Sequence, residues 1–428
     1  MSATSQPQAP ESIEPESTTL MAVLRRLPRP VWMIYLGMFI NRFGTFVLPF
    51  LALHMTAEGY HTIEISVAMG SYGLGHLVAT LLGGYLADSI GRRNTIVVSM
   101  FSGAASMLAL SQADSVVSFA VLAFLTGLTS ELYRPASSAL LSDLVREKDR
   151  VTAFAVYRFA INAGWAFGPA TAGYLSEYSY LWLFVGDALT ASLYGTIALL
   201  GLPVLRARKE RSRRRRGNPL GELSESLRVA FADIRFVRVL ISSLLVAFVF
   251  MQMMTTLGLE VKRSGHSESA YGLILGLNGV IIVLFEIPLT GFTRRLSPLG
   301  VMAAGNALVG LGIGCVAFCQ SVGAYAFAMS IFTVGEMIGM PVALAYVSKL
   351  APESMRGRYM GIYGLAWASS ITLGPSLGMY AFGLSPLLFW LACAGIGILS
   401  AIVLLVPGRA LHRLVLTSPG FAVGANKY

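Results

Sequence analysis

The chain is a succession of long apolar runs separated by short polar segments, from about residue 31 to residue 406. An α-helix needs about 20 apolar residues to cross a hydrocarbon core of about 30 Å. Runs of that order recur and predict an all-α membrane protein with twelve spans. We place six spans at 31–56, 63–87, 95–110, 116–144, 151–175 and 180–202, and six more at 237–259, 270–291, 298–318, 322–350, 357–382 and 386–406.

The polar segments divide the chain into two six-helix bundles. We expect an N-terminal tail at 1–30, a first bundle at 31–203, a basic linker at 204–236, a second bundle at 237–408 and a C-terminal tail at 409–428. The first residues show no secretory n-region or cleavage site, so the first span is expected to be retained. The arginine-rich linker is expected to be solvated and attracted to anionic lipid headgroups, with a specific lipid or partner site as the alternative.

An internal repeat supports this division. Residues 206 positions apart match in both halves, as Pro135 and Pro341 or Tyr157 and Tyr363 do. The pair Glu131 and Glu336 falls one residue out of that register. Such matches favour a duplicated six-helix unit, with pseudo-symmetric halves that rock around a cavity between them.

Composition and charge placement agree with membrane insertion. Of the 428 residues, 55% are hydrophobic and 13% charged, and the formal net charge is +10. With the N-terminus in the cytoplasm, nearly all Lys and Arg outside the spans lie on that side, and only Lys262 and Arg263 lie outside. This distribution follows the positive-inside rule. It predicts an inner-membrane protein with both termini in the cytoplasm and excludes a nucleic-acid partner as the reason for the charge.

A charged motif follows the second span. Its key residues are Gly84, Asp88, Gly91, Arg92 and Arg93. A Gly can allow close helix approach or a turn with positive φ, and the charges can pair at the membrane rim. Together with twelve spans and a basic central linker, this motif resembles the major facilitator superfamily, in which it stabilises one access state.

The fifth span is similar to the motif of proton-linked drug antiporters within that superfamily. It carries Gly164, Gly168, Pro169 and Gly173. Proline bends a helix and glycines let a neighbour approach, so ordinary small-residue packing is the alternative. One departure is Ala123, where such exporters often carry an Arg four residues before the Gly of the fourth span.

Charged side chains inside the bilayer cost about 2.5–3.5 kcal/mol each near its centre, so their retention indicates a role. The predicted spans contain Arg42, Glu131, Arg134, Arg158, Asp187, Glu286 and Glu336. We expect the first four to meet in the inner half of the first bundle. Asp187 and Glu286 are expected in interfacial ion pairs, the latter with Arg294 and Arg295.

We take Glu131 as the proton-coupling carboxylate, with Arg42 as its partner and Arg134 and Glu336 as further members. Burial favours the neutral acid whereas a nearby Arg favours the carboxylate, so movement of the Arg would load and release a proton. A permanent ion pair that fixes helix packing is the alternative. The remaining polar residues inside spans are candidates for lining the substrate cavity, with packing as the alternative for each: Asn41, Tyr157, Arg158, Asn162, Gln252 and Asn278.

These features favour a secondary transporter, and the resemblance favours proton-coupled export of small amphipathic compounds. Import by symport is the rival, because Asn41-Arg42-Phe43 resembles part of a first-span motif of peptide transporters. A non-transporting sensor or scaffold is a weaker alternative. We expect no enzyme activity and no cofactor, because no nucleophile elbow, metal-spaced His cluster or phosphate loop is present. The expected partners are the solute, protons (with sodium as the alternative) and lipid, with the protein a monomer.

Overall fold

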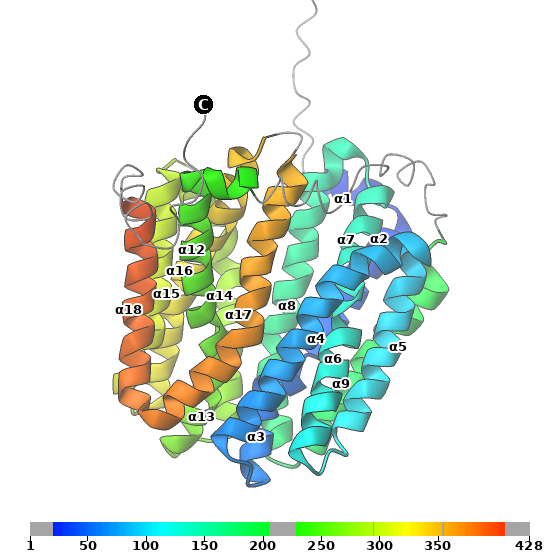
Figure 1. Cartoon of the computed structure of the whole chain (residues 1–428). Helices are drawn as coiled ribbons and strands as arrows, with labels where there is room; N and C mark the ends of the chain where they lie inside the picture. The colour runs from blue at the N-terminus through cyan, green and yellow to red at the C-terminus, as the bar shows by residue number, and fades with distance from the viewer. Residues whose placement is uncertain (1–19, 205–227, 294, 353–354, 407–428) are drawn as a thin grey trace, which may run out of the picture.

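The computed structural model describes residues 20–204 and 228–406, apart from 294 and 353–354. In this part of the chain the regular secondary structure is helical (Figure 1). The first half contains α1 (Leu20–Arg26), α2 (Arg29–Phe43), α3 (Val47–Ala57), α4 (Thr62–Ser89), α5 (Arg92–Leu110), α6 (Val116–Glu131), α7 (Tyr133–Leu144), α8 (Arg150–Ser176) and α9 (Leu181–Gly201). The second half contains α12 (Ile234–Met254), α13 (Thr256–Arg263), α14 (Glu268–Thr293), α15 (Pro298–Cys315), α16 (Val322–Leu350), α17 (Arg356–Leu384) and α18 (Pro386–Leu405).

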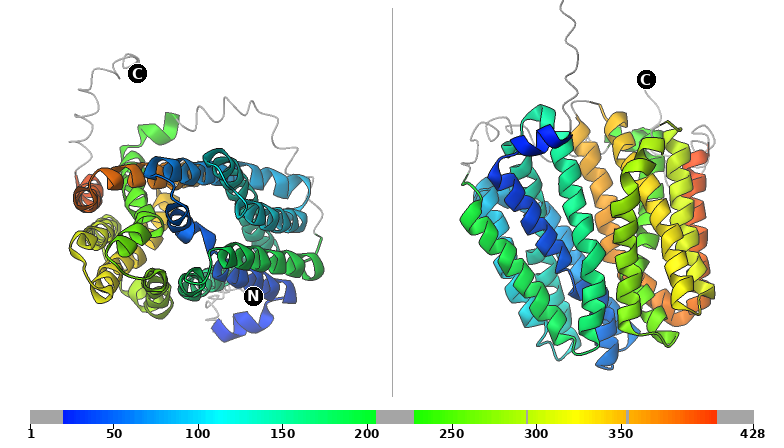
Figure 2. Two further views of the ribbon diagram at one scale, coloured as in Figure 1. Left: turned by 90° about the horizontal axis from the view of Figure 1, so that it is seen from below. Right: turned by 180° about the vertical axis from the view of Figure 1, so that it is seen from behind.

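Helices α2–α9 form one group, the N bundle, and α12–α18 form a second, the C bundle. Figure 2 shows the two groups side by side when the molecule is viewed along its helices. We call the end where α9 ends and α12 begins the linker end, and the opposite end, with α3 and α13, the far end. Three spans are each built from two consecutive helices (α2 with α3, α6 with α7, α12 with α13), which gives the twelve predicted crossings.

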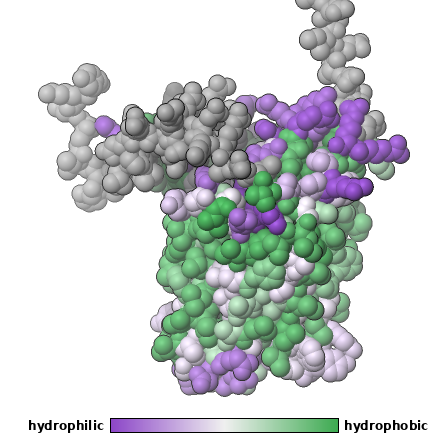
Figure 3. Space-filling view, turned by 90° about the vertical axis from the view of Figure 1, so that its right-hand side faces the viewer, coloured by the Kyte–Doolittle hydropathy of each residue, from purple (hydrophilic) through white to green (hydrophobic). Residues whose placement is uncertain are grey.

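The surface between the two ends is apolar. Among the described helices, nine candidate spans pass a test of length and hydropathy. The spans α5, α8 and α17 do not, and each carries arginines within or at the start of the helix. Figure 3 shows a hydrophobic belt with polar residues toward its ends, as expected of a chain whose sides contact lipid. The predicted all-α membrane fold is therefore confirmed.

The sequence did not predict the breaks within spans. The first span stops at Phe43 and restarts at Val47, and the fourth is interrupted at Leu132. Pro49 and Pro135 each lie at the third position of the new helix. Because proline has no N–H, it cannot donate to the turn before it, and a helix restarts there at less cost than it continues. Each break therefore frees backbone groups inside the membrane.

The two bundles contact each other toward the far end. Helices α4 and α17 approach each other toward the bottom of Figure 1 and spread toward its top. Ser376 Oγ donates to the Ser66 carbonyl at 2.7 Å, and Thr372 Oγ1 donates to the Gly73 carbonyl at 2.9 Å. Both contacts lie in the far half of α4. Helices α8 and α14 form the second inter-bundle contact.

A polar contact outside the helices adds to this closure. The backbone N–H of Ser269, at the start of α14, donates to Glu177 Oε1 just after α8 at 3.2 Å. Hydrogen bonds from Ser269 hold the pKa of Glu177 below its usual range. The ionised form of Glu177 is therefore the one that ties the bundles together at the far end.

Candidate functional site

Glu131 lies at the centre of a charged cluster within the N bundle. It is 8% exposed, and its carboxylate contacts Arg134 Nε at 2.5 Å, His76 Nε2 at 3.6 Å and Arg42 at 3.9 Å. These partners come from α7, α4 and α2. The expected meeting of Arg42, Glu131 and Arg134 is confirmed. Because the site joins three helices through one carboxylate, the charge on Glu131 determines how strongly they are held together.

The break in the fourth span positions this carboxylate. Helix α6 ends at Glu131, and Tyr133 begins α7. Ser99 of α5 bridges the break, because its Oγ donates to the Thr129 carbonyl at 2.5 Å and accepts the Tyr133 N–H at 3.1 Å. The Tyr133 hydroxyl in turn accepts from Arg42 at 2.5 Å. Arg42 is therefore fixed by a phenol as well as by the carboxylate.

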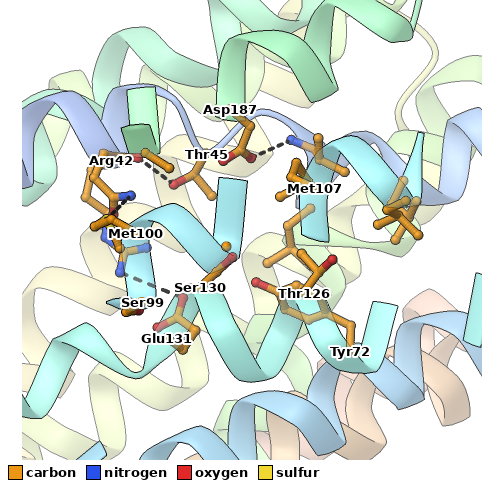
Figure 4. Close-up of a pocket in the computed structure, with 17 residues that line it drawn as sticks. Arg42, Thr45, Tyr72, Ser99, Met100, Met107, Thr126, Ser130, Glu131 and Asp187 are labelled. Carbon is orange, nitrogen blue, oxygen red and sulfur yellow. Dashed lines mark hydrogen bonds and ion pairs between the residues drawn. The ribbon is translucent and has the colours of Figure 1, made fainter. Parts of the chain in front are cut away.

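A small cavity adjoins the cluster (Figure 4). Its walls come from the break between α2 and α3 and from α4, α5, α6 and α9. Arg42, Glu131 and Asp187 all line it, as does Asn41. The prediction that Asn41 lines the substrate cavity stays a prediction. The cavity lies inside the N bundle rather than between the bundles.

Arg158 is not part of the cluster, and this expectation was wrong. Its guanidinium pairs instead with Glu286 of α14 across the bundle interface. Asn162, one turn further along α8, donates to the same carboxylate at 3.3 Å. Glu286 is in an ion pair, as predicted, and its described partner is Arg158. Arg294, one of the two partners that we expected, lies outside the described residues. Arg158 lies on a face of α8 that reaches α14, which spacing alone did not show.

Asp187 is not in the interfacial ion pair that we expected. In the described part of the chain no Lys, Arg or His lies within ion-pair distance of it. Its carboxylate accepts the backbone N–H of Val47, the first residue of α3, at 3.4 Å. The broken first span thus presents a half-helix N-terminus to a buried acid, where the helix dipole stabilises negative charge.

In the C bundle, Glu336 has a different environment from its counterpart. Asn278 of α14 donates to Glu336 at 2.8 Å and to the Thr333 hydroxyl at 3.0 Å. No cationic side chain of the described residues lies within ion-pair distance of Glu336. The two acids therefore occupy related positions in the repeat, but an amide takes the place of the arginines.

Two other cavity candidates are packing residues. Gln252 is fully buried and donates to the Gly374 carbonyl at 3.1 Å, so it holds α12 against α17. Tyr157 is 8% exposed and its hydroxyl donates to Ser137 Oγ at 3.4 Å. Neither lines the cavity beside Glu131. For these two the alternative that we left open, helix packing, describes the contacts.

The motif after α4 agrees with prediction only in part. Gly91 has φ 91°, the turn conformation that we expected of it. Gly84 was predicted to allow close approach, but a Cβ there would meet nothing within 4 Å. Asp88 is exposed and makes no hydrogen bond or ion pair with the described residues, so the predicted contact with the two arginines is absent. Arg92 pairs with Asp143, and Arg93 donates to the last carbonyls of α9.

The glycines of the fifth span do make close contacts. A Cβ on Gly164 would lie 2.7 Å from the Phe39 carbonyl, and one on Gly168 would lie 2.5 Å from the Phe43 carbonyl, both on α2. A Cβ on Gly173 would lie 2.6 Å from the Glu268 carbonyl of the C bundle. Pro169 lies within α8, and its carbonyl touches Gly272. The motif therefore packs α8 against both bundles.

Sequence reasoning missed three members of the site. His76 was not among the predicted site residues, yet its Nε2 lies 3.6 Å from the Glu131 carboxylate. Tyr133 and Thr126 were not singled out, although the first holds Arg42 and the second lines the cavity. The spacing of Thr126, Glu131 and Tyr133 gave no sign of a shared face, because the helix break at Leu132 changes the direction of the chain.

Comparisons with known proteins agree with the fold. Residues 34–375 match the family model described as Major Facilitator Superfamily, with a second match at 259–420. The chain is 27% identical over 397 residues to the multidrug resistance protein MdtH of Aeromonas hydrophila, covering 91% of this chain and 96% of that one. It is 27% identical over 371 residues to a Na⁺, Li⁺, K⁺/H⁺ antiporter of Planococcus maritimus, covering 79% and 85%.

Solved structures support the architecture. A transporter of the POT family, solved with a thioalcohol-conjugated peptide, superposes with a TM-score of 0.72 at 15% identity and covers 92% of this chain and 100% of that one. At that identity the likeness concerns the fold alone. The extent of the family match, together with twelve helical crossings in two bundles, shows that the chain is a membrane transporter that belongs to the major facilitator superfamily.

Proposed function

We propose that this transporter is a proton-coupled antiporter that exports small amphipathic compounds by alternating access. The linker end faces the cytoplasm in this proposal, in accord with the distribution of Lys and Arg along the sequence. The names of the two relatives support it, one as a multidrug resistance protein and the other as a cation/proton antiporter. Contacts between the bundles at the far end then describe a state closed to the outside.

The observation that carries the proposal is the environment of Glu131. Contacts with two arginines and a histidine stabilise the ionised form of this buried carboxylate. The carboxylate lies within the bilayer, where an unpaired charge is costly. Protonation of Glu131 would remove the negative charge and leave Arg42 and Arg134 to repel each other. The proton thus changes the packing of α2, α4 and α7, and packing changes in the N bundle are what alternating access requires.

The test replaces the carboxylate by its neutral isostere. Glu131→Gln is expected to abolish resistance to exported compounds in a drug-susceptibility panel and to abolish proton-driven uptake into everted vesicles, because the proton has no acceptor. Glu147→Gln is the matched control, since Glu147 is exposed in the loop before α8. Proton-driven transport by Glu131→Gln at the wild-type rate would eliminate this role.

The direction of transport has a separate test. In everted vesicles energised by respiration, an antiporter accumulates the compound and a protonophore releases it. Net accumulation driven by an opposite gradient would instead assign the chain to symport, the function that the first-span sequence Asn41-Arg42-Phe43 first suggested.

A further inference from the structure

The cavity beside Glu131 is too small for an exported compound. Its volume is about 30 Å³, whereas one water needs roughly 10–15 Å³ measured in the same way. Its volume is therefore that of two or three waters. It extends between the break in the first span and helices α5, α6 and α9 (Figure 4). Its contents are water or an ion of similar size.

Unpaired polar atoms point to water. Thr126 is 0% exposed and lines the cavity, and its Oγ1 has no hydrogen-bond partner among the described residues. Arg42 Nε, also buried, is unpaired in the same way. A buried threonine on a helix ordinarily bonds the carbonyl of the preceding turn, so an unpaired hydroxyl at a polar space is a binding position for water. Ser130 adds a second hydroxyl to the wall.

Two carboxylates lie at different depths along this cavity. Asp187 is the seventh residue of α9, so it lies about 9 Å from the far end at 1.5 Å per residue. Glu131 is the last residue of α6, about 22 Å from the same end. The hydroxyls of Thr126 and Ser130 belong to the last turns of α6 and lie between these depths. The cavity thus joins an acid near the far end to the acid of the charged cluster.

Among the described residues, Asp187 has no counter-ion within ion-pair distance. The charged or titratable groups nearest to it across the cavity are Arg42 of α2, Glu131 of α6 and Tyr72 of α4. Arg42 is already held by Glu131 and Tyr133. Ionisation of a partly buried carboxylate whose described partner is a backbone N–H is costly, so the group is stable when it binds a proton or a small cation. Among the described residues no group of three His, Cys, Asp or Glu side chains is placed to hold a metal ion, which favours the proton.

We propose that Asp187 is a second proton-binding group and that water in this cavity relays protons between it and Glu131. The inference deepens the proposed function and rests on it. In the relay, the Asp187 acid gives its proton to the adjacent water, and the last water gives one of its own to the Glu131 carboxylate. An O–H bond breaks at Asp187, one forms and one breaks at each water oxygen, and one forms at Glu131. Asp187 ends as a carboxylate and Glu131 as an acid. The net charge of the cavity is unchanged, so no co-reactant is needed.

Through the relay, protons from the far end reach the charged cluster while the two bundles stay in contact there. In the far-end-closed state the proton passes through the N bundle rather than through the substrate path. Protons and compound therefore take separate routes, which lets one be bound as the other leaves.

The experiment uses the full-length protein in proteoliposomes with Asp187→Asn and, as matched control, Asp114→Asn in the exposed loop before α6. Asparagine keeps the shape of the side chain and can still accept the Val47 N–H. We expect Asp187→Asn to lose at least tenfold in proton-driven transport and to retain downhill exchange of compound. Infrared titration is expected to show a carboxylic-acid band in the wild type that Asp187→Asn lacks.

Thr126→Val provides a second variant of nearly equal volume. Without the hydroxyl, water has one partner fewer, so we expect slower proton-driven transport with the infrared band retained. Wild-type coupling in Asp187→Asn, with coupling lost in Glu131→Gln, would overturn the relay and leave the proposed function intact. Coupling retained in both would overturn the proposed function itself. Transport that responds to sodium through Asp187 at constant proton gradient would overturn the assignment to protons.

Discussion

Gly173 offers a direct way to shift the balance between access states. It faces the C bundle at the far end, and a Cβ there would lie 2.6 Å from the Glu268 carbonyl and 2.9 Å from the Ser269 Cα. Both are backbone atoms, which cannot move aside as a flexible side chain can. Gly173→Ala must therefore push α8 and α14 apart at the end where the bundles are closed.

The size of the effect follows from the cost of overpacking, which is about 1–3 kcal/mol for an extra methyl group in a close contact. The state with separated far ends does not bear this cost. The equilibrium between the two states should therefore shift about 5- to 150-fold toward the far-end-open state. A shift of that size is large enough to reverse the populations of two states within a few kcal/mol of each other.

Two glycines serve as matched controls. Gly168→Ala meets the Phe43 carbonyl at 2.5 Å inside the N bundle, so its cost lowers the free energy of unfolding without favouring either access state. Gly84→Ala meets nothing within 4 Å and should change little. All three substitutions gain the same helix propensity, about 1 kcal/mol in water, which cancels in the comparison.

The assay is a distance measurement between spin labels across the far end. Labels at Gln112, in the loop before α6, and Gln320, in the loop before α16, lie on different bundles and are exposed. Residues Cys315, Cys319 and Cys393 are replaced beforehand. Gly173→Ala should lengthen the dominant distance, whereas Gly168→Ala should lower the melting temperature at an unchanged distance. Equal distances in wild type and Gly173→Ala, or equal opening in both variants, would refute the reasoning.

Two further outcomes follow from contacts at either end of the bundles. Arg238→Ala should lower the free energy of unfolding by about 1–3 kcal/mol. The buried Arg238 guanidinium donates to the last carbonyls of α18, and loss of these hydrogen bonds leaves buried acceptors unpaired. Thermal denaturation measures the effect, with Arg235→Ala as the control because its side chain is 63% exposed. The tie between Glu177 and Ser269 should weaken in acid. The hydrogen bonds from Ser269 lower the pKa of Glu177, so the contribution of Glu177 to far-end closure is complete above its ordinary pKa of 4.5. That contribution is lost as the pH falls through the lowered pKa. Glu177→Gln should remove this pH response from the spin-label distances.

The sequence was sufficient for the twelve spans and for three members of the charged cluster. Apolar runs of membrane length specify helices almost by themselves, because the bilayer offers backbone groups no other partner. Arg42, Glu131 and Arg134 were found because charge in that setting is rare. The same reasoning gave no information on which way Arg158 points, since a residue's face depends on the rotation of its helix within the bundle.

The helix breaks explain most of the remaining errors. A continuous first span would place no N–H beside Asp187, and a continuous fourth span would put Glu131 and Tyr133 on different faces. Pro49 and Pro135 are visible in the sequence, but proline within a membrane helix often only bends it. Whether the helix restarts depends on partners such as Ser99, which the sequence places in a different span.

Helix α8 connects the proton cluster to the contact between bundles. On one face a Cβ added to Gly164 would lie only 2.8 Å from the Arg42 Cβ, and Arg42 contacts Glu131. On another face Arg158 and Asn162 hold Glu286 of the C bundle. Any movement of Arg42 that follows a change in the charge on Glu131 is transmitted through backbone contact at Gly164, which has no side chain to absorb it.

The two halves of the repeat have therefore diverged for a physical reason. An acid surrounded by arginines responds to a proton with a large change in local charge balance, whereas Glu336, held by an amide and without a described cation at ion-pair distance, responds with a change in a hydrogen bond. Protonation of Glu131 therefore releases more free energy for the movement of helices than protonation of Glu336 does. In the proposed mechanism, that difference assigns the driving step to the N bundle and makes the C bundle the partner against which α8 moves.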